Sequence, residues 1–294
     1  MAESPTIPDF KLLSPSKAAF RPLEFFLLYG VSGGFSTGNG PKYGVSGGFL
    51  CWGFSFWRKN SKMVGTDEEK EGPAMKVIDL THTINEAMPV YPGTEPPKLT
   101  AANTYEKDGF QETLLSFYSH TGTHIDPPAH LFPERTTLDA FPAEQFVGRA
   151  LAVDCRHLRC GEAITIKELQ KYGEKVEKAD FLLFCLGWDR LWGTEAYFGD
   201  YPCIDRDVLR LILDGNYKGI GFDVIGLDPI ADESLPRHRA LFAQKDIINI
   251  ENLKNLDLCG DGLFRFACLP IKTEHSDGAP CRAIAWLEDE TEGR

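Results

Sequence analysis

The sequence predicts an α/β fold, because short continuous apolar runs alternate with segments of helical spacing. Three runs, at residues 150–154, 181–187 and 219–225, are typical of strands buried on both faces. Between them, residues 165–172 begin with a Thr-x-x-Glu capping box, and residues 205–215 place their apolar side chains at helical spacing. A chain of 294 residues can bury a sizeable core, as one large domain or two smaller ones.

Residues 1–62 differ in composition from the rest of the chain. They contain seven Lys/Arg against three Asp/Glu, a charge of +4, so residues 63–294 must carry −16 to give the formal net charge of −12. The heptapeptide Tyr-Gly-Val-Ser-Gly-Gly-Phe occurs twice, at 29–35 and 43–49, and such glycine density disfavours a packed core. We therefore expect residues 1–74 to be a disordered or atypical extension, and residues 75–290 to form the folded domain.

The extension bears on cellular location. Its basic, serine-containing and acid-poor composition is compatible with an organellar transit peptide, whereas a secretory signal peptide fits poorly. A translation start at Met63 or Met75 would instead remove the extension. Eight cysteines without a Cys-x-x-Cys pair indicate reduced thiols, so we expect a cytoplasmic enzyme unless the extension directs it to an organelle.

The acidic balance of the chain limits its partners. A formal charge of −12 and a pI near 5.1 argue against nucleic acid or an anionic membrane as partner. The apolar stretch 49–57 is also too short to span a bilayer. The sequence contains no P-loop, dinucleotide-binding fingerprint or serine-centred nucleophile elbow, which points away from the chemistry that those motifs carry.

The folded domain begins with alternating apolar residues at 76–84, the pattern of a strand. Residues 88–93 then hold Tyr91 between two prolines, which reduce the entropy lost when an aromatic ring is presented to a ligand. A further strand at 111–119 leads into the segment that carries most of the candidate chemistry.

That segment, residues 120–130, holds three of the seven histidines and one aspartate. His120, His124 and Asp126 point to one side of an extended chain, and their side chains are the usual ligands of Zn²⁺ or Mn²⁺. Two prolines after Asp126 force a turn that can bring His130 back over the same point. Because His130 lies beyond the ligand register and its ordinary pKa suits proton transfer, we expect it to be the general base and acid.

Two later segments carry further candidates. Residues 187–194, together with Tyr197 and Phe198, form an aromatic-rich loop that includes Trp188 and either caps an edge of the core or walls an aromatic pocket. Residues 235–242 have helical spacing, and Glu251 interrupts an apolar strand at 247–253. A buried carboxylate costs several kcal/mol unless it is paired or bound to a metal. Residues 264–270 and 282–287 are expected to be the closing strands.

The motif His-x-Gly-Thr-His-x-Asp-x-Pro-x-His, at residues 120–130, resembles the signature of the metal-dependent cyclase/hydrolase family. That family includes bacterial-type kynurenine formamidase and isatin hydrolase, and the resemblance extends over roughly residues 75–288. It implies a single domain of the swivelling β/β/α type, with mixed sheets and flanking helices. It also implies a homo-oligomer, either a dimer or a tetramer.

The resemblance further implies a site with two ions of Zn²⁺ or Mn²⁺. The first ion would be held by His120, His124 and Asp126, and Asp126 and Glu251 would bridge it to a second ion held also by His238. Tyr91 stands where kynurenine formamidases usually present a Trp to the substrate ring, and Trp188 matches a similar Gly-Trp loop. Both are expected to bind the substrate. Gly226 stands where family members often carry Ser.

The function that the resemblance implies is metal-dependent hydrolysis of a small aromatic amide. The foremost substrate is N-formyl-L-kynurenine, cleaved by an arylformamidase to kynurenine and formate in tryptophan catabolism. Three alternatives stay open: an isatin hydrolase-like enzyme, a polyketide cyclase-like enzyme with a larger pocket, and a metal-binding protein without turnover. The presence of all five ligand candidates and of His130 favours an active enzyme over the last.

Overall fold

The sheet of this chain curls until its first and last strands meet. The computed structural model describes residues 75–287, and within them seven strands close a barrel-like sheet in the order β12-β11-β5-β7-β9-β10-β4, with β4 pairing back to β12. These strands are β4 (His124–Asp126), β5 (Val147–Asp154), β7 (Phe181–Cys185), β9 (Gly219–Phe222), β10 (Ile248–Glu251), β11 (Leu263–Pro270) and β12 (Ala279–Leu287). β1 (Lys76–Asp79) adds to the edge of β12. The expectations for residues 1–74 lie outside the described residues.

The sheet contains both parallel and antiparallel strand pairs, as expected for an α/β fold with mixed sheets. β5, β7, β9 and β10 run parallel to one another, and they include the three apolar runs that predicted buried strands. β11, β12 and β4 pair antiparallel with their neighbours. All five residues of β7 and all four of β9 are buried, because side chains on both faces of these strands meet a core.

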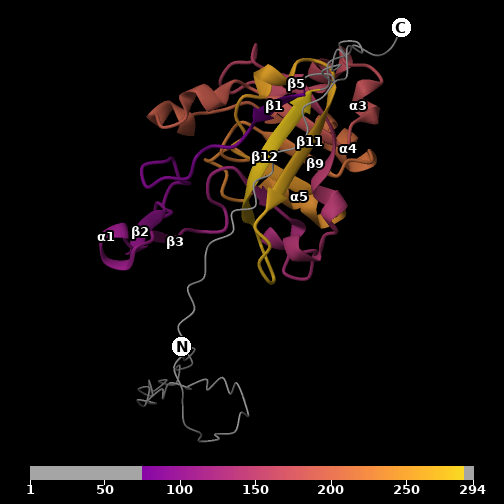
Figure 1. Cartoon of the computed structure of the whole chain (residues 1–294). Helices are drawn as coiled ribbons and strands as arrows, with labels where there is room; N and C mark the ends of the chain where they lie inside the picture. The colour runs from indigo at the N-terminus through magenta and orange to yellow at the C-terminus, as the bar shows by residue number, and fades with distance from the viewer. Residues whose placement is uncertain (1–74, 288–294) are drawn as a thin grey trace, which may run out of the picture. The chain divides into compact units, whose positions relative to one another are not determined.

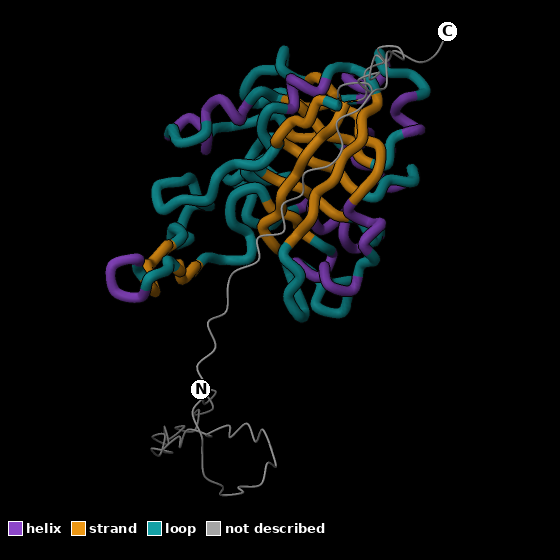
Figure 2. The backbone as a smooth tube through the Cα atoms, in the orientation of Figure 1, coloured by secondary structure: helices purple, strands orange, loops and turns teal. Residues whose placement is uncertain are grey.

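Alternation along the strands divides the core into two clusters. In β5, Ala150 and Ala152 face a cluster that includes Phe181 and Phe266, whereas Leu151 and Val153 face one that includes helix residues. The second cluster lies beneath α2 (Ile166–Gln170), α3 (Lys175–Lys178), α4 (Arg206–Asp214) and α5 (Pro236–Gln244). The helices are short, so the fold depends mainly on the sheet (Figure 2).

The predicted helix starts are confirmed. Thr165 and Glu168 form the capping box of α2. The Thr165 side chain accepts a hydrogen bond from a backbone N–H of the first turn, and the Glu168 carboxylate accepts one from the Thr165 N–H. Asp205 caps α4 by accepting a hydrogen bond from the Val208 N–H at 2.8 Å. α5 begins at Pro236, one residue after the helical segment expected from the sequence, since proline suits the first turn.

A small hairpin stands apart from the barrel (Figure 1). It consists of β2 (Lys98–Asn103), α1 (Tyr105–Asp108) and β3 (Glu112–Ser116). The sequence predicted β3 as the strand that delivers the histidine segment, and the strand is there, but it pairs only with β2. Side chains of the hairpin remain exposed, including those of Leu114 and Tyr105.

The remaining elements are short. A two-stranded sheet joins β6 (Ala163–Ile164) and β8 (Cys203–Ile204). Single 3₁₀ turns span Pro128–His130, Leu138–Ala140, Ala143–Phe146, Trp188–Leu191, Glu195–Phe198 and Leu256–Cys259. Within residues 75–287, no helix is long and apolar enough to span a membrane.

Candidate metal centre

The pairing of β4 with β10 builds the centre of the site. In this antiparallel ladder His124 lies opposite Glu251, and Asp126 lies opposite Asn249. Ile125, between the two ligand candidates of β4, points the other way into the apolar cluster of the barrel. The strand period of two therefore places four polar side chains together on one face.

The first group of candidate ligands is His120, His124 and Asp126. Asp126 Oδ1 lies 2.7 Å from His120 Nδ1 and 3.2 Å from His124 Nε2. The sequence predicted that one extended segment would align all three side chains, and this expectation was wrong for His120. Gly122 adopts a φ of +65°, which breaks the extended run, and β4 begins only at His124.

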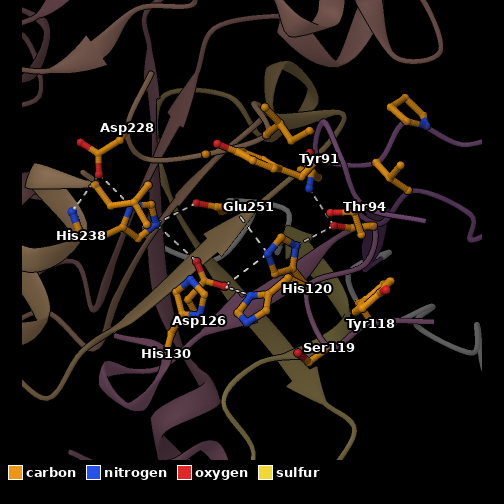
Figure 3. A pocket seen from close by; sticks show the side chains of 18 of the residues that line it. Tyr91, Thr94, Tyr118, Ser119, His120, Asp126, His130, Asp228, His238 and Glu251 are labelled. Carbon is orange, nitrogen blue, oxygen red and sulfur yellow. Dashed lines mark hydrogen bonds and ion pairs between the residues drawn. The ribbon is translucent and has the colours of Figure 1, made fainter. Parts of the chain in front are cut away.

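The second group is Asp126, His238 and Glu251. His238, on α5, places its Nε2 3.2 Å from Glu251 Oε1 and 3.6 Å from Asp126 Oδ2. The ligand atoms within each of the two groups lie within 4.8 Å of one another, and Asp126 belongs to both (Figure 3). The structure thus brings together five residues that the sequence places up to 131 positions apart, from His120 to Glu251.

His130 lies beside these groups. It ends the 3₁₀ turn that follows the two prolines, so the predicted return of the chain is confirmed. Its ring centroid is 4.0 Å from that of His120 and 6.3 Å from that of His238. Burial lowers the pKa of His130, so its imidazole is neutral near pH 7 and free to accept a proton.

The charges of the cluster stabilise one another. Burial opposes ionisation of Asp126, but His124 and His120 hold the pKa of its carboxyl well below the usual range. Burial likewise opposes the charged form of His238, while Asp126, Asp228 and Glu251 raise its pKa well above the ordinary value. A divalent cation bound among these side chains would neutralise the same carboxylates.

The residues present fit a divalent metal. Imidazole nitrogen and carboxylate oxygen are the donors that Zn²⁺ and Mn²⁺ accept. Asn249 Oδ1 is buried at the site and has no hydrogen-bond partner among the described residues, and His120 Nε2 makes no hydrogen bond beyond its 3.5 Å ion pair with Asp277. An unsatisfied polar atom is costly in a protein interior, and its presence here supports a ligand site.

Three polar residues of the site were not predicted from the sequence. Asp228 Oδ2 lies 2.8 Å from His238 Nδ1. Asn249 donates from Nδ2 to Glu251 Oε1 at 2.8 Å and to Asp126 Oδ2 at 3.1 Å. The polar position two residues before Glu251, on the same strand face, is the signal that could have identified Asn249.

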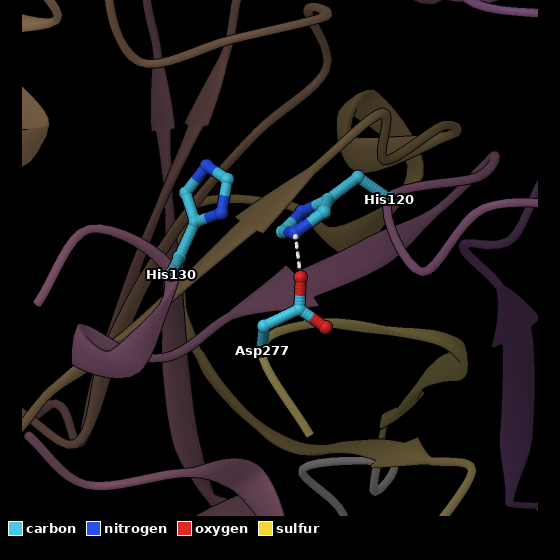
Figure 4. A group of neighbouring side chains, drawn as sticks. All are labelled: His120, His130 and Asp277. Carbon is cyan, nitrogen blue, oxygen red and sulfur yellow. Dashed lines mark ion pairs between the residues drawn. The ribbon is translucent and has the colours of Figure 1, made fainter. Parts of the chain in front are cut away.

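Asp277 is the third, and it lies on the loop before β12 (Figure 4). Its carboxylate is 3.5 Å from His120 Nε2 and accepts a hydrogen bond from the Ser119 hydroxyl at 3.2 Å. Glycine at 278 lets this loop approach, because a Cβ there would collide with the His120 ring. His120, His130 and Asp277 form a further group whose donor atoms lie within 4.8 Å of one another.

A cavity of about 680 Å³ opens over the candidate ligands. Tyr91 lines it and is 41% exposed, as expected for a ring presented to a ligand. Trp188 is not among the described residues that line the cavity, which corrects the expectation that it contacts the substrate. Its ring is buried in the core, and its Nε1 donates to the Tyr197 carbonyl at 3.0 Å, so the aromatic loop caps a core edge.

Comparison with known proteins gives a consistent result. The model of the Cyclase family, described as "Putative cyclase", matches residues 78–229. The kynurenine formamidase of Bacillus thuringiensis (strain Al Hakam) is 30% identical over 209 residues, which cover 70% of this chain and 95% of that protein.

Solved structures share the fold. An isatin hydrolase bound to the product analogue thioisatinate superposes with a TM-score of 0.66 at 21% identity, covering 73% of this chain and 93% of that one. A potential metal-dependent hydrolase with cyclase activity has a TM-score of 0.57 at 29% identity, and covers 74% of this chain and 100% of that one.

Proposed function

This chain belongs to the Cyclase family, and on that premise we propose that it is a metal-dependent amide hydrolase, an arylformamidase that cleaves N-formyl-L-kynurenine to kynurenine and formate. Relatives named kynurenine formamidase support this substrate, and the match covers 95% of the Bacillus thuringiensis protein. The observation that carries the proposal is the β4–β10 ladder. It assembles two groups of nitrogen and oxygen donors around Asp126, directly beneath a cavity.

We assign His120, His124 and Asp126 to one ion, and Asp126, His238 and Glu251 to a second, each Zn²⁺ or Mn²⁺. When bound, a divalent cation supplies Lewis acidity: it polarises an amide carbonyl and lowers the pKa of a water molecule. The donor set does not discriminate between the two metals, because both accept imidazole and carboxylate ligands.

His130 moves the protons of the reaction. Its imidazole lies beside the ligand groups and lines the cavity, so it can reach both the attacking water and the leaving nitrogen. It takes a proton from water as the oxygen adds to the formyl carbon. It then gives that proton to the nitrogen as the C–N bond breaks, which releases formate and the aromatic amine.

Tyr91 orients the substrate. Its ring lines the mouth of the cavity, between Pro89 and Gly93, where it can stack on an aromatic substrate (Figure 3). We do not extend this role to Trp188, because the ring of Trp188 packs in the core.

Three broader features belong to the same proposal. The exposed apolar side chains of the hairpin β2–β3, such as Leu114 and Phe110, support a homo-oligomer, a dimer or tetramer. The seven cysteines of the described residues are free thiols, which supports a cytoplasmic location. The closed mixed sheet with few helices supports the swivelling β/β/α assignment for a single domain at 75–290.

The proposal is tested by turnover of the purified full chain, as metal-free protein and after addition of Zn²⁺ or Mn²⁺. N-formyl-L-kynurenine and isatin are assayed side by side, because an isatin hydrolase shares the fold. Metal-dependent release of kynurenine supports the arylformamidase assignment. Hydrolysis of isatin alone replaces the substrate, and tight metal binding without turnover of either amide reduces the proposal to a metal-binding protein.

A further inference from the structure

The aromatic loop lies behind the metal centre. None of the described residues that line the cavity comes from residues 187–201, and the rings of Tyr197 and Tyr201 are almost completely buried. Trp188 holds the backbone of Tyr197 by a hydrogen bond, and Trp192 packs edge-on against the Tyr197 ring at 5.1 Å. The buried rings of Trp188, Tyr197 and Tyr201 thus anchor residues 187–201 to the core, and each of the two tyrosines extends a hydroxyl toward one ligand group.

The hydroxyl of Tyr197 reaches the first group through Asn252. It donates to Asn252 Oδ1 at 2.6 Å, which orients the amide so that Nδ2 donates to the Gly122 carbonyl at 2.8 Å. The same carbonyl lies 2.8 Å from His124 Nδ1. With Nδ1–H donating to Gly122, the lone pair of His124 Nε2 faces Asp126.

The hydroxyl of Tyr201 reaches the second group through Asp228. It donates to the Asp228 carbonyl at 2.6 Å, and the Asp228 carboxylate lies 2.8 Å from His238 Nδ1. With Nδ1–H donating to that carboxylate, His238 Nε2 faces Asp126 and Glu251. Glycine at 226 leaves room for this contact, because a Cβ there would lie 3.1 Å from the Tyr201 hydroxyl oxygen.

We propose that Tyr197 and Tyr201 are positioning residues that brace the two ligand groups from one loop, the first through Asn252 and His124 and the second through Asp228 and His238. Each hydroxyl fixes the acceptor that selects the metal-binding tautomer of one histidine. Because both tyrosines are anchored in the core by their buried rings, the two histidines keep a fixed relation to Asp126 between them. The inference rests on the ligand roles proposed above and adds the device that holds them in place.

The test compares Tyr197→Phe and Tyr201→Phe with the matched control Tyr217→Phe. Tyr217 is also buried, and its hydroxyl donates to a backbone carbonyl, that of Val176, at 3.2 Å. Each full-chain variant is stripped of metal, and its Zn²⁺ affinity is measured by competition with a chromophoric chelator. The melting temperature of the metal-free protein is recorded in parallel. Direct hydrogen-bond partners of metal-binding histidines typically change metal affinity by about 10- to 100-fold, and each tyrosine acts through such a partner.

We expect Tyr197→Phe and Tyr201→Phe each to weaken Zn²⁺ binding by about tenfold, and Tyr217→Phe to leave it within about twofold of wild type. In a His238→Ala background, Tyr201→Phe should have no further effect, whereas Tyr197→Phe should still weaken the remaining ion. Asn252→Gly provides a second variant for the first arm, since glycine accepts the φ of +56° at that position.

A merely structural role gives a different result. If the two tyrosine variants lower only the melting temperature, and their Zn²⁺ affinities match that of Tyr217→Phe, the inference is overturned while the proposed function stands. If the wild-type chain binds no Zn²⁺, the proposed ligand roles fail and the inference fails with them.

Discussion

Asp126 is the residue on which the whole site converges. Its two carboxylate oxygens face different groups, Oδ1 toward His120 and His124, and Oδ2 toward His238 and Asn249. It is almost completely buried, so its negative charge is tolerated only because these partners surround it. A carboxylate in that position can bridge two cations, which is why the two-ion proposal depends on it more than on any single histidine.

At the residue scale, His130→Ala should lower kcat by about 10²- to 10⁴-fold while the bound metal stays unchanged, because the variant removes only the proton carrier. Metal content is measured by elemental analysis, and turnover with N-formyl-L-kynurenine. The control is His157→Ala, since the His157 side chain is 63% exposed and lies outside the cavity. Full activity of His130→Ala with metal bound would exclude the proposed role.

Asp223 allows a prediction about pH. It is buried and accepts hydrogen bonds from the N–H groups of Leu186 and Gly187, and burial raises its pKa from 3.8 to about 7. The folded chain therefore binds this proton more tightly than the unfolded chain. The stability that results is fully present below pH 3.8 and is lost as pH rises through 7, by up to about 4 kcal/mol.

Asp223→Asn should remove this dependence. The difference in unfolding free energy, wild type minus variant, should therefore decrease as the pH rises from 4 to 7. Denaturant unfolding at several pH values measures it. Asp154→Asn is the control. The pKa of Asp154 shifts in the opposite direction, because the Arg156 hydrogen bond lowers it to about 2. The stability from Asp154 is present above pH 3.8 and is lost only as pH falls toward 2, so it is constant in this window. A flat difference for Asp223→Asn would contradict the raised pKa.

Two elements contribute differently to the molecule. The β4–β10 pair is short, yet its register decides which side chains meet, because a slip of β4 by one residue would turn His124 and Asp126 into the barrel. The hairpin β2–β3 makes almost no contact with the sheet and exposes apolar side chains on both faces, among them Leu114 and Leu115. An isolated two-stranded hairpin is only marginally stable in water, so its burial in the proposed homo-oligomer would stabilise this one.

At the element scale, Leu114→Glu should shift the full chain toward smaller species in light scattering coupled to size-exclusion chromatography. A charge on this face opposes its burial against a second copy. The melting temperature should change little at low protein concentration, because Leu114 is 62% exposed in the single chain. Leu258→Glu is the control, since Leu258 is 49% exposed but lies outside the hairpin. An unchanged mass for Leu114→Glu would remove the hairpin as the interface.

At the scale of the whole molecule, the site joins parts of the chain that are distant in sequence. β4 and β10 come from separate segments, and α5 adds His238 between them. Asn249 donates to the carboxylates of both Asp126 and Glu251, and both carboxylates face His238 Nε2. A bound cation would replace these weaker partners, and the stability of the fold would then depend on metal concentration.

Chelation should therefore lower the melting temperature of the full chain. A ligand at about 1,000 times its Kd stabilises the folded state by about 4 kcal/mol, which corresponds to roughly 10 °C for a domain of this size. Differential scanning calorimetry before and after chelator treatment measures the change, and added Zn²⁺ or Mn²⁺ should reverse it. Asp126→Asn is the control, because loss of the shared ligand should make its melting temperature insensitive to chelator. An equal response of both proteins would place the bound metal elsewhere.

The sequence by itself determined the local features of this protein. The buried strands at 150–154, 181–187 and 219–225 follow from continuous apolar runs, and the start of α2 follows from its capping box. The first ligand group and His130 could be identified because they lie within eleven residues and share one short path of the backbone. Glu251 was singled out because it interrupts an apolar strand, but the ligand roles of His238 and Glu251 came from the resemblance to a family, since their spacing alone carries no signal.

The tertiary structure decided every feature that depends on register or on packing between distant segments. It turned Trp188 into the core, broke the extended run at Gly122, and brought Asp228, Asn249 and Asp277 against the proposed ligands. It also closed the barrel by pairing β4 with β12 and left the hairpin exposed. The physical reason is that sequence spacing sets the direction of side chains within a segment, whereas the approach of two segments depends on the burial and hydrogen bonding of the whole chain.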